Sequence, residues 1–450
     1  MIKNEFFTEG DINFSEERHN WDNQVSDPLT RSILDDDARY FLHQSMSTPC
    51  LDVADRCSGS GITTLSGKHI IDFHGNNVHQ LGYGNEYISE KIKQQISKLS
   101  FSPRRFTNIP AVELAKKLAN ILPGTLNRTL FAPGGTLAVG MAIKLARVVT
   151  GKYKLISVWD SFHGASLDSI SAGGEEVFHK YMEPLLPGVI HIPPVNTYRG
   201  LFGDSELDQL NYARYLEYVI EKEGNIGAFI TETIRNTDVQ VPNKAYWKKI
   251  REICDKNNIL LILDEIPVAL GRTGKMFAFE HFGIEPDILC LGKGLGGGII
   301  PFAAMIARDE FNVAKDVSLG HYTHEKSPLG SIAALAVINF IERENILKKV
   351  EEDGKWIENE LTSMKEEFKL IGDIRGIGLL WGIELVRDPE TKEKATVEAE
   401  RIMYNCMKNG LSFKVSQGNV IQLSPALTIS RQELIKAFSV LRTAFEISGK

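Results

Sequence analysis

Two runs of buried-type apolar residues each end next to a residue that could do chemistry. The run ILLILD ends on Asp264, and the run DILCL is followed two residues later by Lys293, inside the glycine-rich stretch GKGLGGG. Taken alone, a helix-capping Asp and a surface lysine are the plainer interpretations. Together they lie where α/β sheets bind ligands, at the carboxyl ends of strands, and a desolvated lysine has the lowered pKa that a Schiff-base amine requires. We therefore predict a lysine that bonds covalently to a carbonyl compound beside a carboxylate.

Two further segments could hold a flat, phosphorylated ligand. In FAPGGTLAVGMAIKLAR, Gly134, Gly135 and Thr136 lie between a strand candidate and a helix start, where backbone N–H groups and the helix dipole attract a phosphate and the Thr hydroxyl adds a donor. A plain helix cap would use the same residues. In WDSFHGAS, Phe162 and His163 follow another strand candidate, and the ring of Phe162 could stack on a flat cofactor or belong to the core. GKGLGG also matches the dinucleotide pattern but opens no helix, so we expect no Rossmann site.

The elements that position these residues alternate along the chain. Strand candidates alternate with helical patterns from about residue 111, which predicts a mostly parallel sheet covered on both faces. After Pro328 a long helix, a pair of strand candidates and two more helices predict a smaller α+β lobe. We expect an N-terminal arm or segment of the small domain at 1–60, a large domain at 61–328 and a small α+β domain at 329–450. The strand candidates are 130–132, 154–158, 227–231, 259–264, 287–291 and 370–386; the helices are 111–122, 136–149, 245–257, 329–349, 396–409 and 430–447.

Composition limits the classes of partner. The 450 residues include 51 Lys and Arg against 58 Asp and Glu, a net charge of −7, so the overall field favours neither nucleic acid nor an anionic membrane. No run has the length of a membrane span, and the N-terminus lacks a signal-peptide pattern. The five cysteines form no CxxC pair, so we expect neither a disulfide framework nor a metal site. These features predict a cytoplasmic protein.

Taken in order, the segments resemble the class III aminotransferases, a family of fold-type I enzymes that use pyridoxal 5′-phosphate (PLP). The resemblance covers nearly the whole chain and is most specific at 259–301, where LILDE, GRTG, PDI and GKGLGGG match the family's cofactor core. It implies an α/β large domain with a mostly parallel seven-stranded sheet flanked by helices, and a smaller α+β C-terminal domain. It also implies catalytic roles for two residues: Lys293 carries the cofactor as a Schiff base, and Asp264 keeps the pyridine nitrogen protonated so that the ring accepts electrons.

The resemblance assigns other residues to the cofactor as well. Ile266 and Phe162 would cover the two ring faces, and Glu232 in FITETI matches a family glutamate. Thr323 in GHYTHEKSP matches a threonine that the partner subunit donates, which implies a homodimer. The cofactor set implied for this chain is Gly135, Thr136, Phe162, His163, Glu232, Asp264, Ile266, Lys293 and Thr323.

Departures from the family pattern bear on the substrate. The phosphate motif Ser-Gly-Thr-Glu-Ala-Asn-Glu reads Gly-Gly-Thr-Leu-Ala-Val-Gly here, ending at Gly140, and Pro267 replaces a Gln that contacts the cofactor. Gln422 stands where enzymes for α-amino acids carry a carboxylate-binding Arg, which argues against such substrates. Arg104 and Arg105 in SFSPRRFT suit a phosphate or phosphonate, although two solvated loop charges would look the same.

A second polar cluster lies at the expected substrate entrance. DFHGNNVHQLGYG contains His74, Asn76 and His79, which could contact a small anionic amine or serve the structure. With the PRR segment they resemble the (R)-1-hydroxy-2-aminoethylphosphonate ammonia-lyase subgroup of phosphonate catabolism. In that reaction the substrate amine bonds to the cofactor, the amine-bearing carbon is deprotonated, and β-elimination leads to phosphonoacetaldehyde and ammonia. The alternatives are a class III transaminase for an ω-amine and, more remotely, a non-catalytic ligand sensor.

Overall fold

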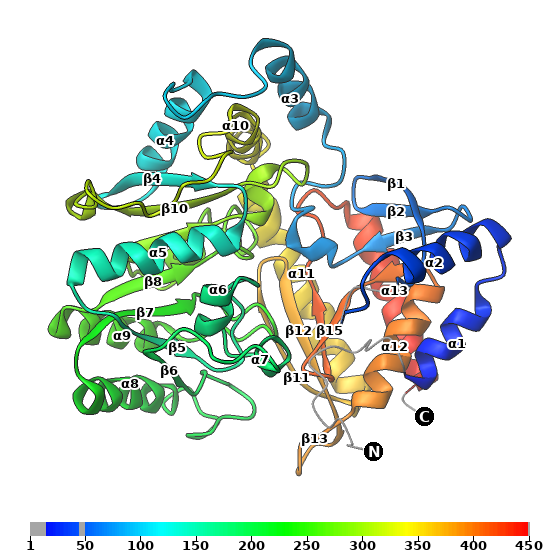
Figure 1. The fold of residues 1–450 in the computed structure, drawn as a ribbon. Coiled ribbons are helices and arrows are strands. Elements are labelled where there is room, and N and C mark those ends of the chain that lie inside the picture. Colours follow the sequence, from blue (N-terminus) through cyan, green and yellow to red (C-terminus); the bar gives the residue numbers. More distant parts are fainter. Residues whose placement is uncertain (1–14, 45–49, 449–450) are drawn as a thin grey trace. The chain divides into compact units, whose positions relative to one another are not determined.

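The computed structural model describes residues 15–44 and 50–448. The chain divides into two compact units. One consists of the residues up to Gly84 together with those from Glu351 onward, and the other is Asn85–Val350. Both are drawn in Figure 1, and each is described by itself.

The unit Asn85–Val350 is built on a seven-stranded sheet, as the sequence predicts. Six of its strands run parallel, and β10 is antiparallel to both of its neighbours. The strand β4, which precedes the phosphate motif, is the outermost strand on this side of the sheet and pairs with β10. In spatial order the strands are β4 (Leu126–Ala132), β10 (Ala303–Arg308), β9 (Ile288–Leu291), β8 (Leu260–Asp264), β7 (Ile226–Glu232), β5 (Lys154–Val158) and β6 (Val189–Ile192).

Helix α5 (Gly135–Thr150) covers one face of this sheet. Its residues from Ala138 to Ala146 form one buried cluster with inward-facing residues of β4, β5, β7, β8, β9 and β10, and Figure 1 shows the helix lying along the strands. On the sequence the helix is apolar nearly all round, which is typical of a helix buried in a core. The other helices of this unit are α3 (Glu86–Lys98), α4 (Ile109–Ile121), α6 (Leu167–Ala172), α7 (Glu176–His179), α8 (Gln209–Glu223), α9 (Lys244–Asn257) and α10 (Pro328–Arg343).

The other unit contains two smaller sheets. One joins β1 (Ala54–Ser58), β2 (Gly61–Thr64), β3 (His69–Asp72) and β14 (Leu411–Ser412), and the other joins β11 (Ile371–Ile377), β12 (Leu380–Asp388), β16 (Val420–Leu423) and β15 (Lys414–Ser416), with β13 (Glu393–Lys394) paired to β12. Most of α11 (Ile346–Glu367) also belongs to this unit. Its other helices are α1 (Glu16–Gln24), α2 (Pro28–Tyr40), α12 (Thr396–Lys408) and α13 (Arg431–Ser448).

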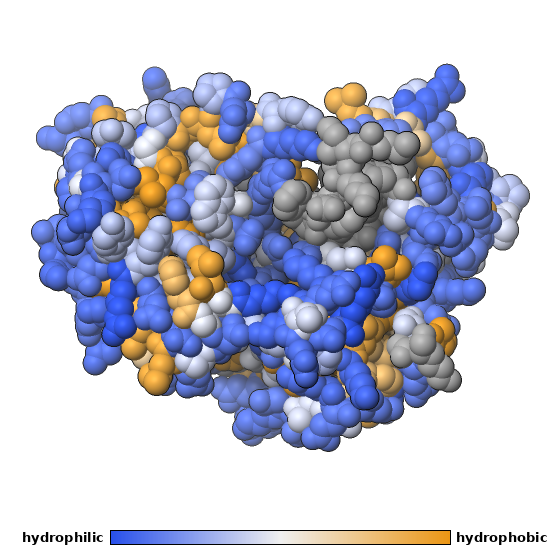
Figure 2. Space-filling view, turned by 90° about the horizontal axis from the view of Figure 1, so that it is seen from below, coloured by the Kyte–Doolittle hydropathy of each residue, from blue (hydrophilic) through white to orange (hydrophobic). Residues whose placement is uncertain are grey.

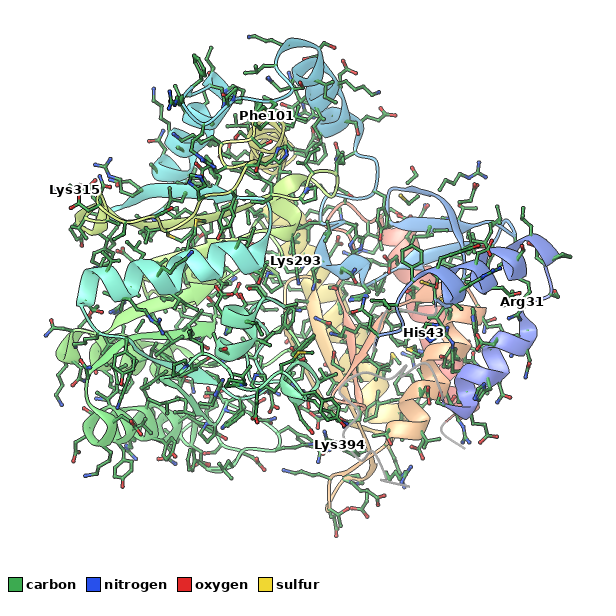
Figure 3. The ribbon with its side chains drawn as sticks, viewed as in Figure 1. Arg31, His43, Phe101, Lys293, Lys315 and Lys394 are labelled. Atoms are coloured by element: carbon green, nitrogen blue, oxygen red, sulfur yellow. The ribbon has the colours of Figure 1, made fainter. Side chains whose placement is uncertain are left out.

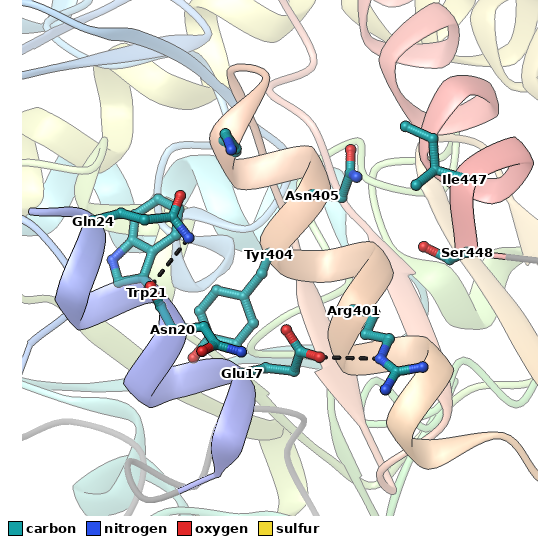
Figure 4. Close-up of a pocket in the computed structure, with 10 residues that line it drawn as sticks. Glu17, Asn20, Trp21, Gln24, Arg401, Tyr404, Asn405, Ile447 and Ser448 are labelled. Carbon is teal, nitrogen blue, oxygen red and sulfur yellow. Dashed lines mark hydrogen bonds and ion pairs between the residues drawn. The ribbon is translucent and has the colours of Figure 1, made fainter.

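The described N-terminal segment packs within its own unit. Helix α1 lies against α12 through the Trp21–Tyr404 ring pair, whose centroids are 5.7 Å apart, and through an ion pair from Glu17 to Arg401 at 3.0 Å. Figure 4 shows these side chains around a small surface pocket of about 320 Å³. The weak sequence periodicity there reflects a helix that buries only two residues, Arg18 and Trp21.

The domain limits differ from those that the sequence suggests. The predicted boundary at residue 60 falls inside the β1–β2 hairpin, and β3 pairs in parallel with β14 near residue 411, so residues 61–84 belong with the C-terminal segment. In contrast, α10 packs on α3 and α4 and stays with the large sheet. The predicted helix 329–349 is two helices, because Asn345 adopts a left-handed φ of 51° between α10 and α11.

Other sequence predictions match within a few residues, but two strands of the large sheet were missed, as were most strands of the two smaller sheets. The strand at 154–158 is β5, the helix at 245–257 is α9, and the helix at 396–409 is α12. The missed strands of the large sheet are β6 and β10, which are short segments without clear alternation. No helix of the described residues is long and apolar enough to cross a membrane. On the face shown in Figure 2 hydrophilic residues predominate.

Candidate active site

The carboxyl ends of four neighbouring strands bring the predicted residues to one edge of the large sheet. In the parallel register Glu232 at the end of β7 pairs with Asp264 at the end of β8, and Asp264 pairs with Cys290 of β9. Lys293 follows Cys290 by three residues, and the loop after β5 carries His163. The sheet therefore assembles in space what the sequence spreads over more than 130 residues.

Asp264 is buried at this edge and is held by two donors. Its Oδ1 accepts a hydrogen bond from the Ile266 N–H at 3.0 Å, and its Oδ2 lies 2.9 Å from Nδ1 of His163. Burial opposes the charged form of His163, but the hydrogen bond and charge of Asp264, helped by the charge of Glu232, outweigh it, so the pKa of His163 is raised. The imidazole is thus favoured as a cation, and its hydrogen bond orients the carboxylate.

Glu232 is buried next to Asp264 at the ends of β7 and β8. Its Oε1 accepts from the Asn236 N–H at 3.1 Å, while its Oε2 has no hydrogen-bond partner among the described residues. Burial raises the pKa of Glu232 to about 7, against the opposing charge of His163. Its sequence-predicted contact with a cofactor stays a prediction.

Lys293 begins a short 3₁₀ turn, η3 (Lys293–Gly296), directly after β9. Its φ of 47° lies in the left-handed region that residues other than glycine rarely adopt. Such strain is typical of functional positions that the surrounding fold holds in place. The side chain is half-buried, and Figure 3 shows Lys293 close to the end of the sheet at which α5 begins.

Ile266 lies between the phosphate motif and the lysine turn. A Cβ added at Gly135 would come within 2.8 Å of Ile266 Cδ1, and one added at Gly292 within 3.2 Å of its Cγ2. Any side chain at Gly135 would therefore displace the isoleucine. Phe162 packs its ring against Phe178 with centroids 4.8 Å apart, and more than a third of its side chain stays exposed. Both residues have an apolar surface left to cover a flat ring.

The first turn of α5 provides donors for an anion. No side chain caps this 16-residue helix, and Gly134 at its N-cap has extended backbone and open space where a Cβ would be. No described residue accepts from the N–H groups of Gly135 and Thr136. Together with the helix dipole these two groups can hold a phosphate.

The Thr136 hydroxyl belongs to a small network of serines. Ser166 donates to Asp168, and Ser169 donates to the Thr136 carbonyl at 3.1 Å. Thr136 Oγ1 lies 2.7 Å from the Ser166 hydroxyl and 2.8 Å from that of Ser169. Because both serines have used their single proton, Thr136 must donate to one of them. Its predicted donation to phosphate would require this network to rearrange.

Asp168 was not singled out from the sequence. A Cβ at Gly140 of α5 would lie only 2.4 Å from Asp168 Oδ2, so the carboxylate fits because residue 140 has no side chain. A signal for it was present in the sequence, because the family motif has a Glu where this chain has Gly140. The helix α5 thus lacks the family carboxylate at residue 140, and Asp168 of α6 places a carboxylate beside this position.

Arg104 and Arg105 differ in their surroundings. Arg104 donates from Nε to Glu325 at 2.9 Å, and its Nη1 lies 2.5 Å from Nε2 of His321. Both partners were missed, because they lie more than 200 residues away in the segment that contains Thr323. No described residue forms a hydrogen bond or ion pair with the exposed Arg105. Thr323 is exposed as well.

The residues predicted to line the substrate entrance belong to the other unit, and they differ in burial and in hydrogen bonding. His79 is buried, donates from Nε2 to the Asp72 carbonyl at 3.1 Å, and packs on Tyr83. These contacts favour a structural role. His74 is half-buried and precedes a 3₁₀ turn in which Asn76 is exposed with a φ of 49°. Gln422 is buried in β16, paired with Gly382 and Lys414.

Comparison with known proteins identifies the family. The aminotransferase class-III family model matches residues 43–445. The chain belongs to this family. It is 57% identical to an (R)-1-hydroxy-2-aminoethylphosphonate ammonia-lyase from Vibrio splendidus (strain 12B01), over 98% of the chain and 95% of that protein.

Solved structures of the same family share the fold. An (S)-enantioselective omega-transaminase from Thermomicrobium roseum matches with a TM-score of 0.88 and 28% identity, over 93% of this chain and 99% of that one. An amine transaminase from an uncultivated Pseudomonas species in its PLP-bound form matches with a TM-score of 0.85 and 28% identity, over 91% of this chain and 99% of that one. The class III chain is accordingly a fold-type I, PLP-dependent enzyme.

The residues at the sheet edge fit this cofactor. The uncapped start of α5 suits its phosphate, a buried carboxylate supported by a cationic imidazole suits its ring nitrogen, and Ile266 and Phe162 offer apolar surface for its ring. Lys293 begins the turn that follows β9, at the same strand-end edge.

The His163–Asp264 pair gives a first prediction. In Asp264→Asn the imidazole loses the negative charge that opposes burial, and its remaining hydrogen bond is to a neutral amide oxygen, so its pKa should fall from above the ordinary value of 6.5 to below it. Histidine ring ¹⁵N NMR, with the His163 signal assigned by its loss in His163→Gln, measures this change. Asp255→Asn, which removes an exposed carboxylate of α9, should leave the His163 pKa unchanged. An unaltered His163 pKa in Asp264→Asn would refute the coupling.

Proposed function

We propose that the chain is a PLP-dependent ammonia-lyase that converts (R)-1-hydroxy-2-aminoethylphosphonate to phosphonoacetaldehyde and ammonia in phosphonate catabolism. The observation that carries this proposal is the 57% identity to a protein of that name over 98% of the chain. The transaminases compared above are 28% identical. A transaminase acting on an ω-amine remains the competing function, because both would use the same cofactor residues.

Lys293 would serve as the acid and base of the reaction. PLP, when bound, supplies an electron-accepting ring to which the substrate amine becomes attached. The lysine amine, freed at that point, takes a proton from the amine-bearing carbon. The electrons of that C–H bond form a carbon–carbon double bond as the neighbouring C–O bond breaks. The lysine ammonium is then the nearest acid to protonate the departing hydroxyl, which leaves as water.

The balance of the reaction explains why no second substrate is needed. Water lost from the carbon skeleton is regained when the nitrogen-bearing product hydrolyses, so the hydroxylated amine gives one aldehyde and one ammonia without a change in overall oxidation state. A transaminase instead stores the amino group on its cofactor and needs a keto acid. The buried Asp264–His163 pair would support the ring nitrogen in either case.

Arg105 is the better of the two arginines for binding the phosphonate. Arg104 already shares its guanidinium with Glu325 and His321, whereas Arg105 is exposed and no described residue pairs with it. A guanidinium binds phosphonate oxygens through a charge-assisted fork. The Gln at 422 supports the same substrate class, because an α-carboxylate would lack its usual arginine. His74, Asn76 and His79 stay candidates for contacts with the rest of the substrate.

A second copy of the chain is the proposed partner. A cavity of about 970 Å³ opens between α4, β4, α5 and the segment 311–326. Large apolar side chains stand exposed nearby, among them Phe106 at 67% and Ile109 at 64%. Since monomers rarely expose such clusters, and the face in Figure 2 is mostly hydrophilic, this surface suits a homodimer interface. The exposed Thr323 would then reach the phosphate site of the partner. A cytoplasmic location completes the proposal.

The reaction type can be tested by ammonia release. With the hydroxylated aminophosphonate and no keto acid, the purified holoenzyme should release many equivalents of ammonia and aldehyde, because the cofactor is regenerated in every turnover. Coupled glutamate dehydrogenase and an aldehyde assay measure both products. Lys293→Ala should lose at least a thousandfold in kcat, since it lacks the proton carrier. One equivalent of product followed by arrest, relieved by a keto acid, would establish a transaminase instead.

Arg105 gives a prediction about specificity. Arg105→Ala should lower kcat/KM for the aminophosphonate by about 10- to 100-fold, because a charge-assisted hydrogen bond contributes about 1.5–3 kcal/mol. An amino alcohol without the phosphonate should react equally well with both proteins. Arg214→Ala, an exposed arginine of α8, is the matched control and should change nothing. Equal losses on both substrates would contradict phosphonate binding by Arg105.

The interface gives a prediction about assembly. Val112→Asp places a charge in the lining of this cavity, at an exposed valine of α4, and should shift the protein from dimers to monomers at micromolar concentration, as measured by light scattering after size exclusion. Ile96→Asp alters an isoleucine of α3 that is also exposed but lies outside the cavity lining, and should remain dimeric. A parent protein that is monomeric would exclude this partner.

A further inference from the structure

A small cavity lies behind the ends of β5 and β7, away from the lysine. Its volume is about 30 Å³, which is room for one or two water molecules. Apolar walls come from Val158 of β5 and from Val195 and Pro194 after β6. The remaining wall is polar, with residues of the β7 turn and of the start of α9.

Three polar atoms of the lining residues lack hydrogen-bond partners among the described residues. They are Oε2 of Glu232, Nη1 of Arg235 and Nε1 of Trp247. Arg235 is fixed by two bonds to Asp238, from Nε at 2.6 Å and from Nη2 at 2.5 Å, so its Nη1 is left over. Oδ2 of Asp160 lies 3.9 Å from that atom, which is an ion-pair distance but too far for a hydrogen bond. Each such buried atom without a partner costs about 1–3 kcal/mol.

The hydrogen-bonding capacities of these three atoms are complementary to those of a water molecule. Trp247 and Arg235 each present an N–H donor, and Glu232 presents an acceptor, which together make the three hydrogen bonds that a buried water typically forms. A dry cavity would be lined by apolar groups alone. Ser161 also lines the cavity, and its hydroxyl, which donates to the Val158 carbonyl at 2.7 Å, can still accept the second water proton.

We propose that this cavity binds a structural water held by Trp247, Arg235 and Glu232, and that through this water Glu232 is a positioning residue for the His163–Asp264 pair. The inference deepens the proposed function, because it rests on Asp264 as the ring-nitrogen partner. The water donates to Oε2 of Glu232 and stabilises its anionic form. The anion in turn favours the protonated imidazole that holds Asp264.

The groups around Glu232 make it sensitive to such a donor. His163 faces it from the loop after β5, Asp264 from β8, Arg235 and the Asn236 N–H from its own turn, and Tyr246 lines the cavity from α9. Asp264 and burial disfavour its charge, whereas His163, Arg235 and Asn236 favour it. The balance is close enough that one hydrogen bond from water can decide it.

The test removes one water ligand at a time in the holoenzyme. Trp247→Phe keeps an aromatic side chain and removes the N–H together with the rest of the five-membered ring, so the His163 pKa, followed by ring ¹⁵N NMR, should fall by about half to one pH unit. Glu232→Gln should lower it further, because the charge itself is lost. Crystals of the parent protein should show density for water in the cavity, and those of Trp247→Phe weaker density or none.

Tyr212→Phe is the matched control. Tyr212 of α8 also has a buried hydroxyl without a hydrogen-bond partner among the described residues, but it does not line the cavity, so its removal should leave the His163 pKa unchanged. Thermal unfolding of each variant separates lost stability from lost coupling, because a purely structural role would lower Tm without altering the imidazole pKa.

The outcomes are separable from those of the proposed function. An empty cavity in well-resolved crystals of the parent, or a His163 pKa that stays constant in both Trp247→Phe and Glu232→Gln, overturns this inference even if ammonia is released as expected. A transaminase result in the ammonia assay would leave the water and the pKa measurements intact. The pH dependence of the bound cofactor's absorbance should shift with the His163 pKa in both variants if Asp264 serves the ring nitrogen.

Discussion

The contact between His163 and Asp264 constrains the rest of the site. An unpaired charge is costly to bury, so the buried carboxylate of Asp264 needs a positively charged partner. The imidazole at 2.9 Å supplies the positive charge, but it is buried too and needs negative charges around it to remain protonated. Asp264 and Glu232 provide them. The three residues are therefore one electrostatic unit, and the loss of any member changes the other two.

The parallel sheet is what allows this unit to exist. Parallel neighbours in register end at the same edge, so Glu232 and Asp264 are adjacent although 32 residues separate them. The antiparallel β10 lies between β9 and β4, so β4 ends at the same edge, and α5 begins there. A cofactor with a phosphate at one end and a ring nitrogen at the other matches this spread of a helix N-terminus and a buried carboxylate.

At the phosphate side of the site, the directions of the hydroxyl protons decide which groups are free to donate to a phosphate. Ser166 and Ser169 have committed their hydroxyl protons, so the proton of Thr136 points toward them. The backbone N–H groups of Gly135 and Thr136 are consequently the donors that need no rearrangement. The absence of a side chain at Gly140 of α5 leaves room for the Asp168 carboxylate of α6.

The sequence by itself determined the family, the cofactor and the alternation of strands and helices, because the apolar strand runs and the motifs around Asp264 and Lys293 are local signals. It also indicated the seven-stranded sheet, through the resemblance, but neither β6 nor β10, whose short patterns are ambiguous. Only the tertiary structure decided which residues meet. Arg104 with Glu325, Thr136 with Ser166, and Glu232 with a cavity lined by Trp247 are contacts between distant segments. Hydrogen bonding and burial set the charges of these groups, and neither is defined until the chain has folded.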